Sequence, residues 1–329
     1  MCKTDDMRDY PRIARELIRA LRGRRSQAHL SRRLGYASNV VFDWEAGRRF
    51  PTAATALRVA RRVGVDLRAA VSGFLPAARW PRTVDPASRQ GVALLLRDLR
   101  GQVQIGELAA ATGCSRFAVS RWLRGHTEPR LPDLLRLVDG SSLRLLDFLA
   151  AFVDVSQLPA LQGEWQQLSL ARQLAYDVPW SHAVLRVLEL ASYQKLPRHV
   201  PGLIAGKLGI SLAEEQRCLE LLARAGQIYR ARGRYRVDQA RTVDTRYDPA
   251  RSRELRAFWS RVGVERMLAG ADGDYAFNLF SVSSADLERL RGLQQAYFQE
   301  LRSIVARSEP ADQVVLANLQ LLPLAQLEP

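Results

Sequence analysis

The pattern of hydrophobic and polar positions predicts short helices that are separated by Ser, Gly and Pro. Ser26 suits the start of a helix that runs to Leu34, because its hydroxyl accepts an unpaired N–H of the first turn. Gly35 ends that helix, since glycine readily adopts the left-handed conformation found just beyond a helix. A second helix is expected at about residues 38–46 and a third over residues 52–63.

The same pattern recurs 78 residues further along the chain. Residues 16–23 read ELIRALRG, and residues 94–101 read LLLRDLRG. The offset also pairs Leu30 with Leu108, Gly35 with Gly113, Val41 with Val119, Trp44 with Trp122, Gly47 with Gly125 and Pro51 with Pro129. One gap-free offset that spans about 60 residues indicates two copies of one domain. In the second copy, the two short helices are expected over residues 105–112 and 115–124.

Two short helices joined by a glycine turn make a helix-turn-helix, whose second helix enters the major groove of DNA. The first copy resembles the lambda-repressor/Cro type of this motif, also called the xenobiotic-response-element type. The resemblance lies in Gln27-Ala28-His29-Leu30, Leu34-Gly35, Val41, Trp44-Glu45, Gly47 and Pro51. In the second copy it lies in Leu108-Ala109, Thr112-Gly113-Cys114-Ser115, Val119-Ser120, Trp122, Gly125 and Pro129.

The resemblance implies which side chains meet DNA. It implies that Gln27 contacts a phosphate or a base. The equivalent position of the second copy is Ile105, which cannot make that contact. The positions expected in the groove are Ser38, Asn39, Phe42 and Asp43 in the first copy, and Ser115, Arg116, Phe117, Ser120 and Arg121 in the second. Arg116 and Arg121 can each donate two hydrogen bonds to guanine O6 and N7. Arg48, Arg49, Arg124 and His126 follow these helices and are expected to position the DNA backbone.

The two copies differ in their groove residues, so one chain is expected to read two different half-sites. Asp43 would repel phosphates, although it could accept a hydrogen bond from a cytosine amino group. The first copy therefore reads an unusual base step, binds more weakly, or serves as a packing platform. Trp44 and Trp122 are expected to pack inside their own domains rather than to touch DNA.

The net charge of +15 is concentrated in the N-terminal half. Residues 1–150 hold 27 Lys and Arg against 14 Asp and Glu, whereas residues 151–329 hold 22 against 20. The positive charge of the N-terminal half favours nucleic acid, a polyanion, as a partner. RNA ranks below double-stranded DNA, because the basic half has few aromatic residues for stacking on unpaired bases.

The sequence offers no chemistry for an enzyme. It has no GxSxG, P-loop or GxGxxG motif, and its four His and three Cys lack metal-ligand spacing, so no cofactor is expected. No apolar run is long enough to cross a membrane, and the N-terminus shows no secretion signal. A cytoplasmic, nucleoid-associated protein is expected.

The domain organisation predicted from these patterns is mainly α. Two tandem five-helix helix-turn-helix domains are expected over residues 8–75 and 89–158, with a linker over residues 76–88 and a second boundary near residues 154–163. Residues 165–240 predict a winged-helix-like domain, because helices over 182–192, 200–208 and 211–225 precede a hairpin over 227–237.

The winged-helix-like segment has surfaces of opposite charge. Glu214, Glu215 and Glu220 on its third helix would face phosphates, whereas Arg230, Arg232, Arg234 and Arg236 make the hairpin basic. The hairpin either grips the DNA backbone, with Arg232 and Arg234 as the contacts, or meets the acidic helix of a partner subunit. Both interpretations stay open.

Residues 241–329 are expected to form a small α+β domain for regulation or dimerisation. A helix over residues 284–306 that begins at Ser284 and a buried strand within residues 313–324 are predicted. This segment resembles an uncharacterised domain that follows helix-turn-helix modules in predicted bacterial regulators. The sequence thus favours a transcriptional regulator that binds double-stranded DNA, forms a homodimer and answers to an unknown effector or protein partner. The alternative is a protein-interaction module of antitoxin type with secondary DNA binding.

Overall fold

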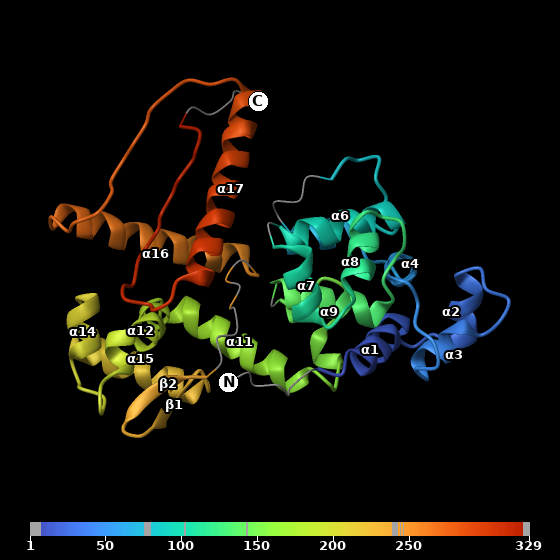
Figure 1. The fold of residues 1–329 in the computed structure, drawn as a ribbon, viewed down its shortest axis with the longest axis horizontal. Coiled ribbons are helices and arrows are strands. Elements are labelled where there is room, and N and C mark those ends of the chain that lie inside the picture. Colours follow the sequence, from blue (N-terminus) through green and yellow to red (C-terminus); the bar gives the residue numbers. More distant parts are fainter. Residues whose placement is uncertain are drawn as a thin grey trace. The chain divides into compact units, whose positions relative to one another are not determined.

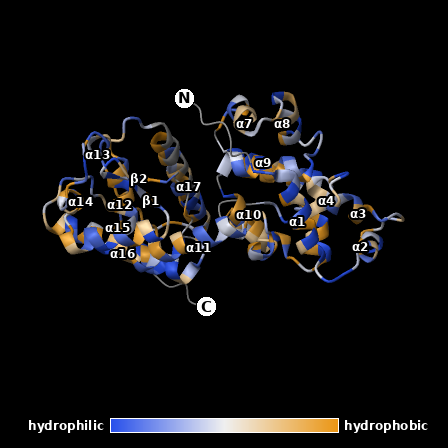
Figure 2. Ribbon diagram, turned by 90° about the horizontal axis from the view of Figure 1, so that it is seen from below, coloured by the Kyte–Doolittle hydropathy of each residue, from blue (hydrophilic) through white to orange (hydrophobic). Residues whose placement is uncertain are grey.

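The computed structural model of the chain describes residues 8–75, 80–101, 103–142, 144–238, 243, 245 and 247–324. These residues are mainly helical, and their only sheet has two strands (Figure 1). The chain divides into two compact units, Met1–Gln166 and Gln167–Pro329. Hydrophobic and hydrophilic residues intermix along the helices of both units (Figure 2).

The first unit contains both copies of the sequence repeat. The first repeat has α1 (Tyr10–Arg22), α2 (Gln27–Arg33), α3 (Val40–Glu45), α4 (Ala53–Arg62) and α5 (Leu67–Phe74). The second repeat has α6 (Arg89–Arg100), α7 (Ile105–Thr112), α8 (Arg116–Leu123), α9 (Leu131–Ser142) and α10 (Leu145–Ala150). An offset of 78 residues places each helix of the first repeat within two residues of the bounds of its counterpart. The repeat of the sequence is therefore also a repeat of helices.

The ends of these helices follow from local chemistry. The Ser26 hydroxyl accepts a hydrogen bond from His29 N at 3.2 Å and so begins α2, as the sequence predicts. Ser115 begins α8 in the same way, through Ala118 N at 3.1 Å. Gly113 ends α7 with a φ of 63°, a left-handed conformation that glycine adopts without strain.

The predicted linker and the predicted boundary after the second repeat each contain buried apolar residues. Within the linker, residues 76–79 lie outside the described residues, but Val84 and Ala87 are buried. The boundary segment contains the short 3-10 helix η1 (Val155–Gln157), and Val155 and Leu158 are fully buried. Apolar residues of both segments therefore contribute to the core of the unit.

The two repeats contact each other through a short antiparallel bridge between Thr52 and Arg130. Ala53 N donates to Pro129 O, and Leu131 N donates to Pro51 O, each at 2.9 Å. The bridge lies just before α4 in the first repeat and just before α9 in the second.

The second unit is built around a helical core and one hairpin. Helix α11 (Gln162–Asp177) crosses the boundary between the units, and α12 (Trp180–Glu189), α13 (Ala191–Gln194), α14 (Leu203–Leu208) and α15 (Leu212–Arg224) follow it. Strands β1 (Ile228–Ala231) and β2 (Arg234–Val237) pair antiparallel, with Ile228 opposite Val237. Ser211 begins α15, and Arg232-Gly233 forms the hairpin turn, both as the sequence predicts.

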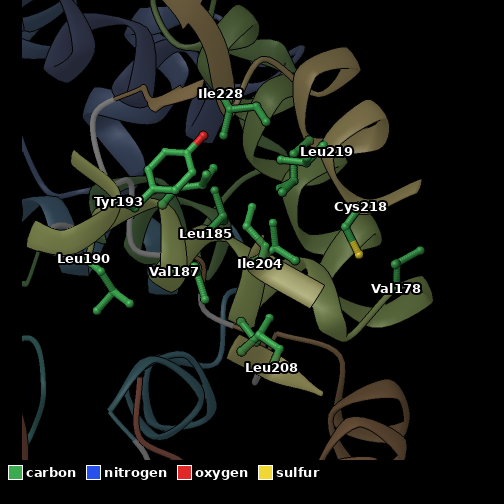
Figure 3. Close-up of a cluster of buried hydrophobic side chains, with 14 of the residues drawn as sticks. Val178, Leu185, Val187, Leu190, Tyr193, Ile204, Leu208, Cys218, Leu219 and Ile228 are labelled. Carbon is green, nitrogen blue, oxygen red and sulfur yellow. The ribbon is translucent and has the colours of Figure 1, made fainter. Parts of the chain in front are cut away.

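A cluster of buried hydrophobic side chains holds α12, α14, α15 and the hairpin together (Figure 3). Tyr193, Ile204 and Cys218 are fully buried within it. The leucines that give α12 and α15 their apolar stripes also lie in this cluster, namely Leu185, Leu188, Leu219 and Leu222. They form the core of this unit and are not available to a second chain.

The end of the chain differs from the predicted α+β domain. Its described part contains α16 (Pro249–Leu268) and α17 (Ser284–Arg307), and no strand follows Val237 within that part. Residues 313–324 form neither helix nor strand, and Val315 is 77% exposed, so the predicted buried strand is wrong. An apolar run becomes a buried strand only where another strand pairs with it, and the described residues supply none. Helix α17 starts at Ser284 as expected, but the residue that caps it is Ser283, whose hydroxyl accepts from Asp286 N at 3.0 Å.

Candidate nucleic-acid interface

Helix α8 presents cationic and aromatic side chains to solvent. Arg116, Phe117 and Arg121 are exposed, Phe117 to 84%, and Ser120 is half-buried beside them. Residues three and four apart share one face of a helix, so these four side chains form a single surface. Neither Arg116 nor Arg121 makes an ion pair with any residue that the structure describes. Their guanidinium groups are therefore available to an external acceptor.

The turn after α8 continues this cationic surface. Arg124 is the last residue of the helical turn, and both it and His126 are exposed. His126 N donates to Arg121 O at 2.9 Å, which fixes the turn against the end of the helix. The predicted groove residues and the predicted phosphate contacts of the second repeat thus lie on consecutive, exposed parts of one short segment.

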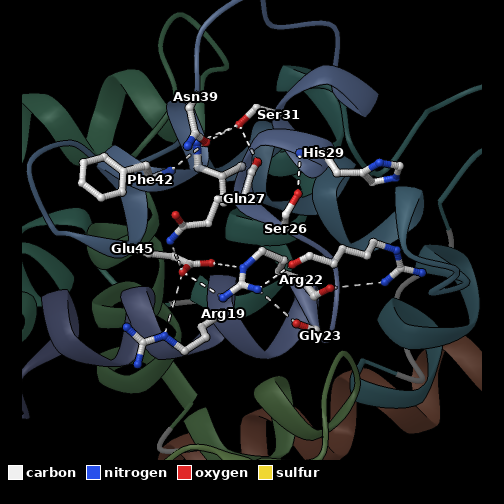
Figure 4. A network of polar contacts seen from close by, with 12 residues as sticks. Arg19, Arg22, Gly23, Ser26, Gln27, His29, Ser31, Asn39, Phe42 and Glu45 are labelled. Carbon is white, nitrogen blue, oxygen red and sulfur yellow. Dashed lines mark hydrogen bonds and ion pairs between the residues drawn. The ribbon is translucent and has the colours of Figure 1, made fainter.

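The equivalent surface of the first repeat begins with Ser38 and Asn39, which are both exposed. The Asn39 side-chain oxygen accepts from Phe42 N at 3.4 Å and from the Ser31 hydroxyl at 3.1 Å (Figure 4). Asn39 is consequently the residue that begins α3, and these two bonds orient its amide. The sequence placed Asn39 on the groove surface but did not predict this structural role.

Arg48 compensates the charge of Asp43 on the same surface. Its Nη1 lies 3.6 Å from Asp43 Oδ1, and its guanidinium lies 5.0 Å from the centre of the Phe42 ring. Phe42 is 43% exposed, and Arg49 is exposed nearby. The predicted repulsion between Asp43 and phosphates is reduced by this pairing. The α3 surface therefore carries one net positive charge from Asp43, Arg48 and Arg49, fewer than the three arginines Arg116, Arg121 and Arg124 give the α8 surface.

Gln27 is directed into the protein rather than toward a ligand. Its Nε2 donates to Glu45 Oε2 at 2.7 Å (Figure 4). Glu45 is buried, and it also accepts from Arg22 Nε at 2.6 Å and from Arg22 Nη2 at 3.1 Å. These hydrogen bonds join α1, α2 and α3. The bonds from Arg22 to the Glu45 carboxylate raise the pKa of Arg22 above its ordinary value. The amide N–H that was expected to contact DNA thus positions α3 through Glu45.

The second repeat holds its helices together without this carboxylate. The residues equivalent to Glu45 and Gln27 are Leu123 and Ile105, and Leu123 is buried. Arg100, the counterpart of Arg22, keeps a buried Nε that has no hydrogen-bond partner among the described residues. The Glu45 centre was not predicted from the sequence, although a charged residue next to a core tryptophan, as in Trp44-Glu45, indicates such a site.

The hairpin of the second unit exposes fewer arginines than its sequence suggests. Arg232 lies in the turn with a φ of 50° and is exposed. Arg234 Nη1 donates to Leu196 O at 2.7 Å and to Gln194 O, and Arg236 Nη1 donates to the Gln194 side chain. Of the two predicted wing contacts, only Arg232 is available to a partner, because backbone carbonyls hold Arg234.

Glu215, one of the three glutamates expected to disfavour DNA binding by α15, is completely buried. Its carboxylate accepts from Gly202 N at 3.0 Å and from Ala205 N at 2.5 Å, which satisfies the unpaired donors at the start of α14. His199 Nε2 lies 3.6 Å from Glu215 Oε1. Burial lowers the pKa of His199, although Glu215 opposes that shift. Glu215 is therefore a structural residue of the second unit.

A cavity of about 650 Å³ lies within the second unit. Trp180, Trp259 and Val262 contribute apolar walls, and His182 and Arg266 bring cationic or basic nitrogen groups to the lining. Burial lowers the pKa of His182, so its imidazole favours the neutral form there. The cavity has the size and chemistry to hold a small, largely apolar molecule that carries a negative charge.

Residues 160–324 match the family model described as Domain of unknown function (DUF4423), and this range is half of the chain. The chain belongs to this family. The DUF4423 range contains the core cluster, the hairpin, the cavity, α16 and α17, and so includes both segments that the sequence analysis separated near residue 240. No curated protein and no solved structure matches the chain.

Two kinds of feature are absent from the described residues of the DUF4423 protein. They contain no group of three or more His, Cys, Asp and Glu side chains that could hold a metal ion. Within the same part of the chain, every helix is too short or too polar to cross a membrane.

Proposed function

We propose that this DUF4423 protein is a sequence-specific, DNA-binding transcriptional regulator of bacterial origin. In this proposal, α2 with α3 and α7 with α8 act as two helix-turn-helix motifs. The observation that carries the proposal is the surface of α8, on which Arg116 and Arg121 are exposed and form no ion pair with any described residue. Exposed guanidinium groups on a short helix suit guanine O6 and N7 in the major groove.

The second repeat supplies the principal base contacts in this mechanism. Arg116 and Arg121 read base edges, while Arg124 and His126 contact phosphates and set the position of the helix. The first repeat adds Ser38 and Asn39 to the groove surface, and Arg49 to the backbone contacts. The concentration of positive charge in residues 1–150 supports this division, because it is the half of the chain that would lie along a polyanion.

The DUF4423 half is assigned to signal binding and oligomerisation. Its cavity is large enough for a small effector, and its residues 264–324 expose many large apolar side chains. These include Leu268, Phe277, Leu279, Leu293, Ile304 and Val315. Exposed apolar surface of this extent is typical of a protein–protein interface. The proposal places the protein in the cytoplasm, on the nucleoid, and gives it no catalytic activity.

A gel-shift experiment with the full chain tests the proposed function. Duplexes from the promoter of its own gene are offered with and without a structured RNA as competitor. We expect retention of the duplex that survives the RNA and that is lost when Arg116 and Arg121 are both changed to Ala. The matched control is Arg217→Ala, which removes an exposed arginine of α15 in the other unit. Equal retention by the double variant would contradict the assignment of α8.

The second candidate function is a protein-interaction module of antitoxin type with secondary DNA binding. The exposed apolar side chains of residues 264–324 favour it, since a partner chain could cover them. Purification from the native cell separates the two functions. A stoichiometric partner of different sequence, together with no selectivity between promoter and unrelated duplexes, would favour the antitoxin-type function. A homo-oligomer that selects particular duplexes would favour the regulator.

A further inference from the structure

The bridge between the repeats has a symmetry that a sequence repeat alone does not impose. Ala53 N donates to Pro129 O, and Leu131 N donates to Pro51 O, both at 2.9 Å. Residues 51 and 129 are equivalent in the repeats, and so are residues 53 and 131. Exchanging the repeats therefore turns each of these hydrogen bonds into the other.

The helices beside the bridge contact each other with the same symmetry. The start of α1 contacts α9: Arg8, just before the helix, and the hydroxyl of Tyr10, its first residue, both bind Asp139, the hydroxyl at 2.8 Å. The segment before α6 contacts α4, where Asp85 binds Arg61 at 3.0 Å. Positions 61 and 139 are equivalent, so each repeat uses the same two regions with the charges reversed. Because the acidic and basic partners are exchanged, Arg61 pairs with the segment before α6, and Asp139 pairs with the start of α1.

A contact that is unchanged when its two sides are exchanged is the mark of two-fold symmetry. Domains arranged head to tail would instead use a different surface on each side. Residues 51–53 would then not face residues 129–131, their equivalents in the other repeat. The repeats are consecutive in the sequence but are paired like the two subunits of a dimer. One chain thus contains both halves of a pseudo-dimer.

We propose that the two repeats of one chain bind a single DNA site whose two half-sites are inverted relative to each other and differ in sequence. This inference rests on the proposed function and specifies its DNA. Two-fold relation of the repeats inverts the half-sites, because the symmetry of a DNA site mirrors that of the protein. The half-sites differ because α3 carries Asn39 and Asp43 where α8 carries Phe117 and Arg121. The fixed bridge also fixes the spacing between them.

The arrangement of the half-sites is tested by selecting duplexes from a random pool with the full chain. We expect two different motifs in inverted orientation at one constant spacing. Turning one motif around into a direct repeat, or inserting five base pairs between the motifs, should weaken binding at least tenfold, because five base pairs are about half a helical turn. The control duplex carries the same five base pairs outside the site.

Three outcomes of that selection are distinguishable. A direct repeat, or a single motif without a second half-site, would overturn the inverted site but leave the regulator function standing. Tolerance of the five-base-pair insertion would do the same. Failure to enrich any duplex would contradict the proposed function itself.

A disulfide across the bridge tests whether the paired form is the one that binds DNA. Thr52 and Arg130 are directly opposite each other and exchange no hydrogen bond, an arrangement with a Cα separation of about 4.5 Å that a disulfide can span. The variant Thr52→Cys/Arg130→Cys is compared with itself, oxidised and reduced. Both forms lack the two native side chains, so only the cross-link differs between them.

We expect the cross-link to form and the oxidised protein to bind the selected duplex within twofold of the reduced protein. A tenfold loss on oxidation that reduction restores would show that the repeats separate on DNA, and would overturn the inference. Failure of the two cysteines to join under oxidising conditions would overturn it as well. The single variants serve as controls for Cys2, Cys114 and Cys218; burial raises the pKa of Cys218 to about 12, which keeps it from competing as a thiolate.

Discussion

Glu45 and Leu123 occupy the same position in the two repeats, yet one is a buried carboxylate and the other a buried hydrocarbon. Glu45 is bound by Arg22 and Gln27, and it joins the first three helices of its repeat. Leu123 is buried at the equivalent position, and its backbone oxygen accepts from Arg97 Nε of α6 at 2.7 Å. The same position next to a short helix is therefore polar in the first repeat and apolar in the second.

Loss of the Glu45 hydrogen bonds should destabilise the first repeat. Glu45→Ala leaves the Arg22 guanidinium and the Gln27 amide without their partner, and we expect a loss of about 2–4 kcal/mol in the stability of the first repeat. Hydrogen exchange of peptides from residues 10–46 measures this loss separately from the rest of the chain. Glu220→Ala, which breaks the exposed ion pair with Arg224, should cost about 0–1 kcal/mol.

A double variant that carries the apolar residues of the second repeat is a stricter test of the role of Glu45. Glu45→Leu combined with Gln27→Ile installs the residues of the second repeat, and it should be less destabilising than Glu45→Ala because it fills the space and removes the unpaired amide. If the two variants lost equal protection from exchange, apolar packing could not replace the hydrogen bonds of Glu45 in the first repeat.

Arginines on and after α8 should affect DNA binding in two different ways. Arg121→Ala should cost about 1–3 kcal/mol on the cognate duplex and relax selectivity at one base position, because it removes a bidentate base contact. Arg124→Ala should weaken all duplexes about equally. Fluorescence anisotropy against the cognate duplex and its single-base variants measures both. Uniform weakening by both variants would mean that α8 does not read bases.

DNA binding by the full chain should depend steeply on salt. Log affinity should fall linearly with log salt by about 0.9 for each neutralised phosphate, and Arg124→Ala should reduce the slope by about one contact. Removal of residues 1–158 should abolish binding. Tight binding by the fragment 160–329 would show that the division of labour between the two halves is wrong.

The second unit should lose stability in mild acid. Burial lowers the pKa of both His182 and His199, so the folded unit favours their neutral forms. Their contribution is complete above the ordinary histidine pKa of about 6.5 and is lost as pH falls through the lower folded-state values. Chemical denaturation monitored by exchange in residues 180–237 should show this fall. His182→Gln should flatten it, while the exposed His29→Gln should leave it unchanged; an unaltered profile in the first variant would refute the assignment.

Residues 264–324 should mediate self-association. Leu268 is 82% exposed and Phe277 is 92% exposed, and burial of such side chains at an interface is favourable. Sedimentation equilibrium of the fragment 160–329 and of the full chain at tens of micromolar should show a dimer, and Leu268→Ser/Phe277→Ser should shift it toward monomer. A clean monomer before any substitution would remove the argument for a homodimer.

The sequence by itself determined the features that depend on neighbouring residues. The repeat, the helix starts at Ser26, Ser115 and Ser211, and the hairpin turn at Arg232-Gly233 could all be predicted, because capping and turn chemistry act over a few residues. The mainly helical character and the charge difference between the halves also followed from the sequence. These signals place the candidate residues on their helices without knowledge of any distant partner.

Only the tertiary structure decided which side chains are available and what each segment meets. Gln27 and Glu215 are turned inward by partners that no spacing rule connects to them, and the apolar run over 313–324 is not a buried strand. The bridge between Thr52 and Arg130 joins residues 78 positions apart and turns a tandem repeat into a two-fold pair. Such choices depend on the packing of the whole unit, because a hydrogen bond or a buried surface forms with whichever group the fold brings close.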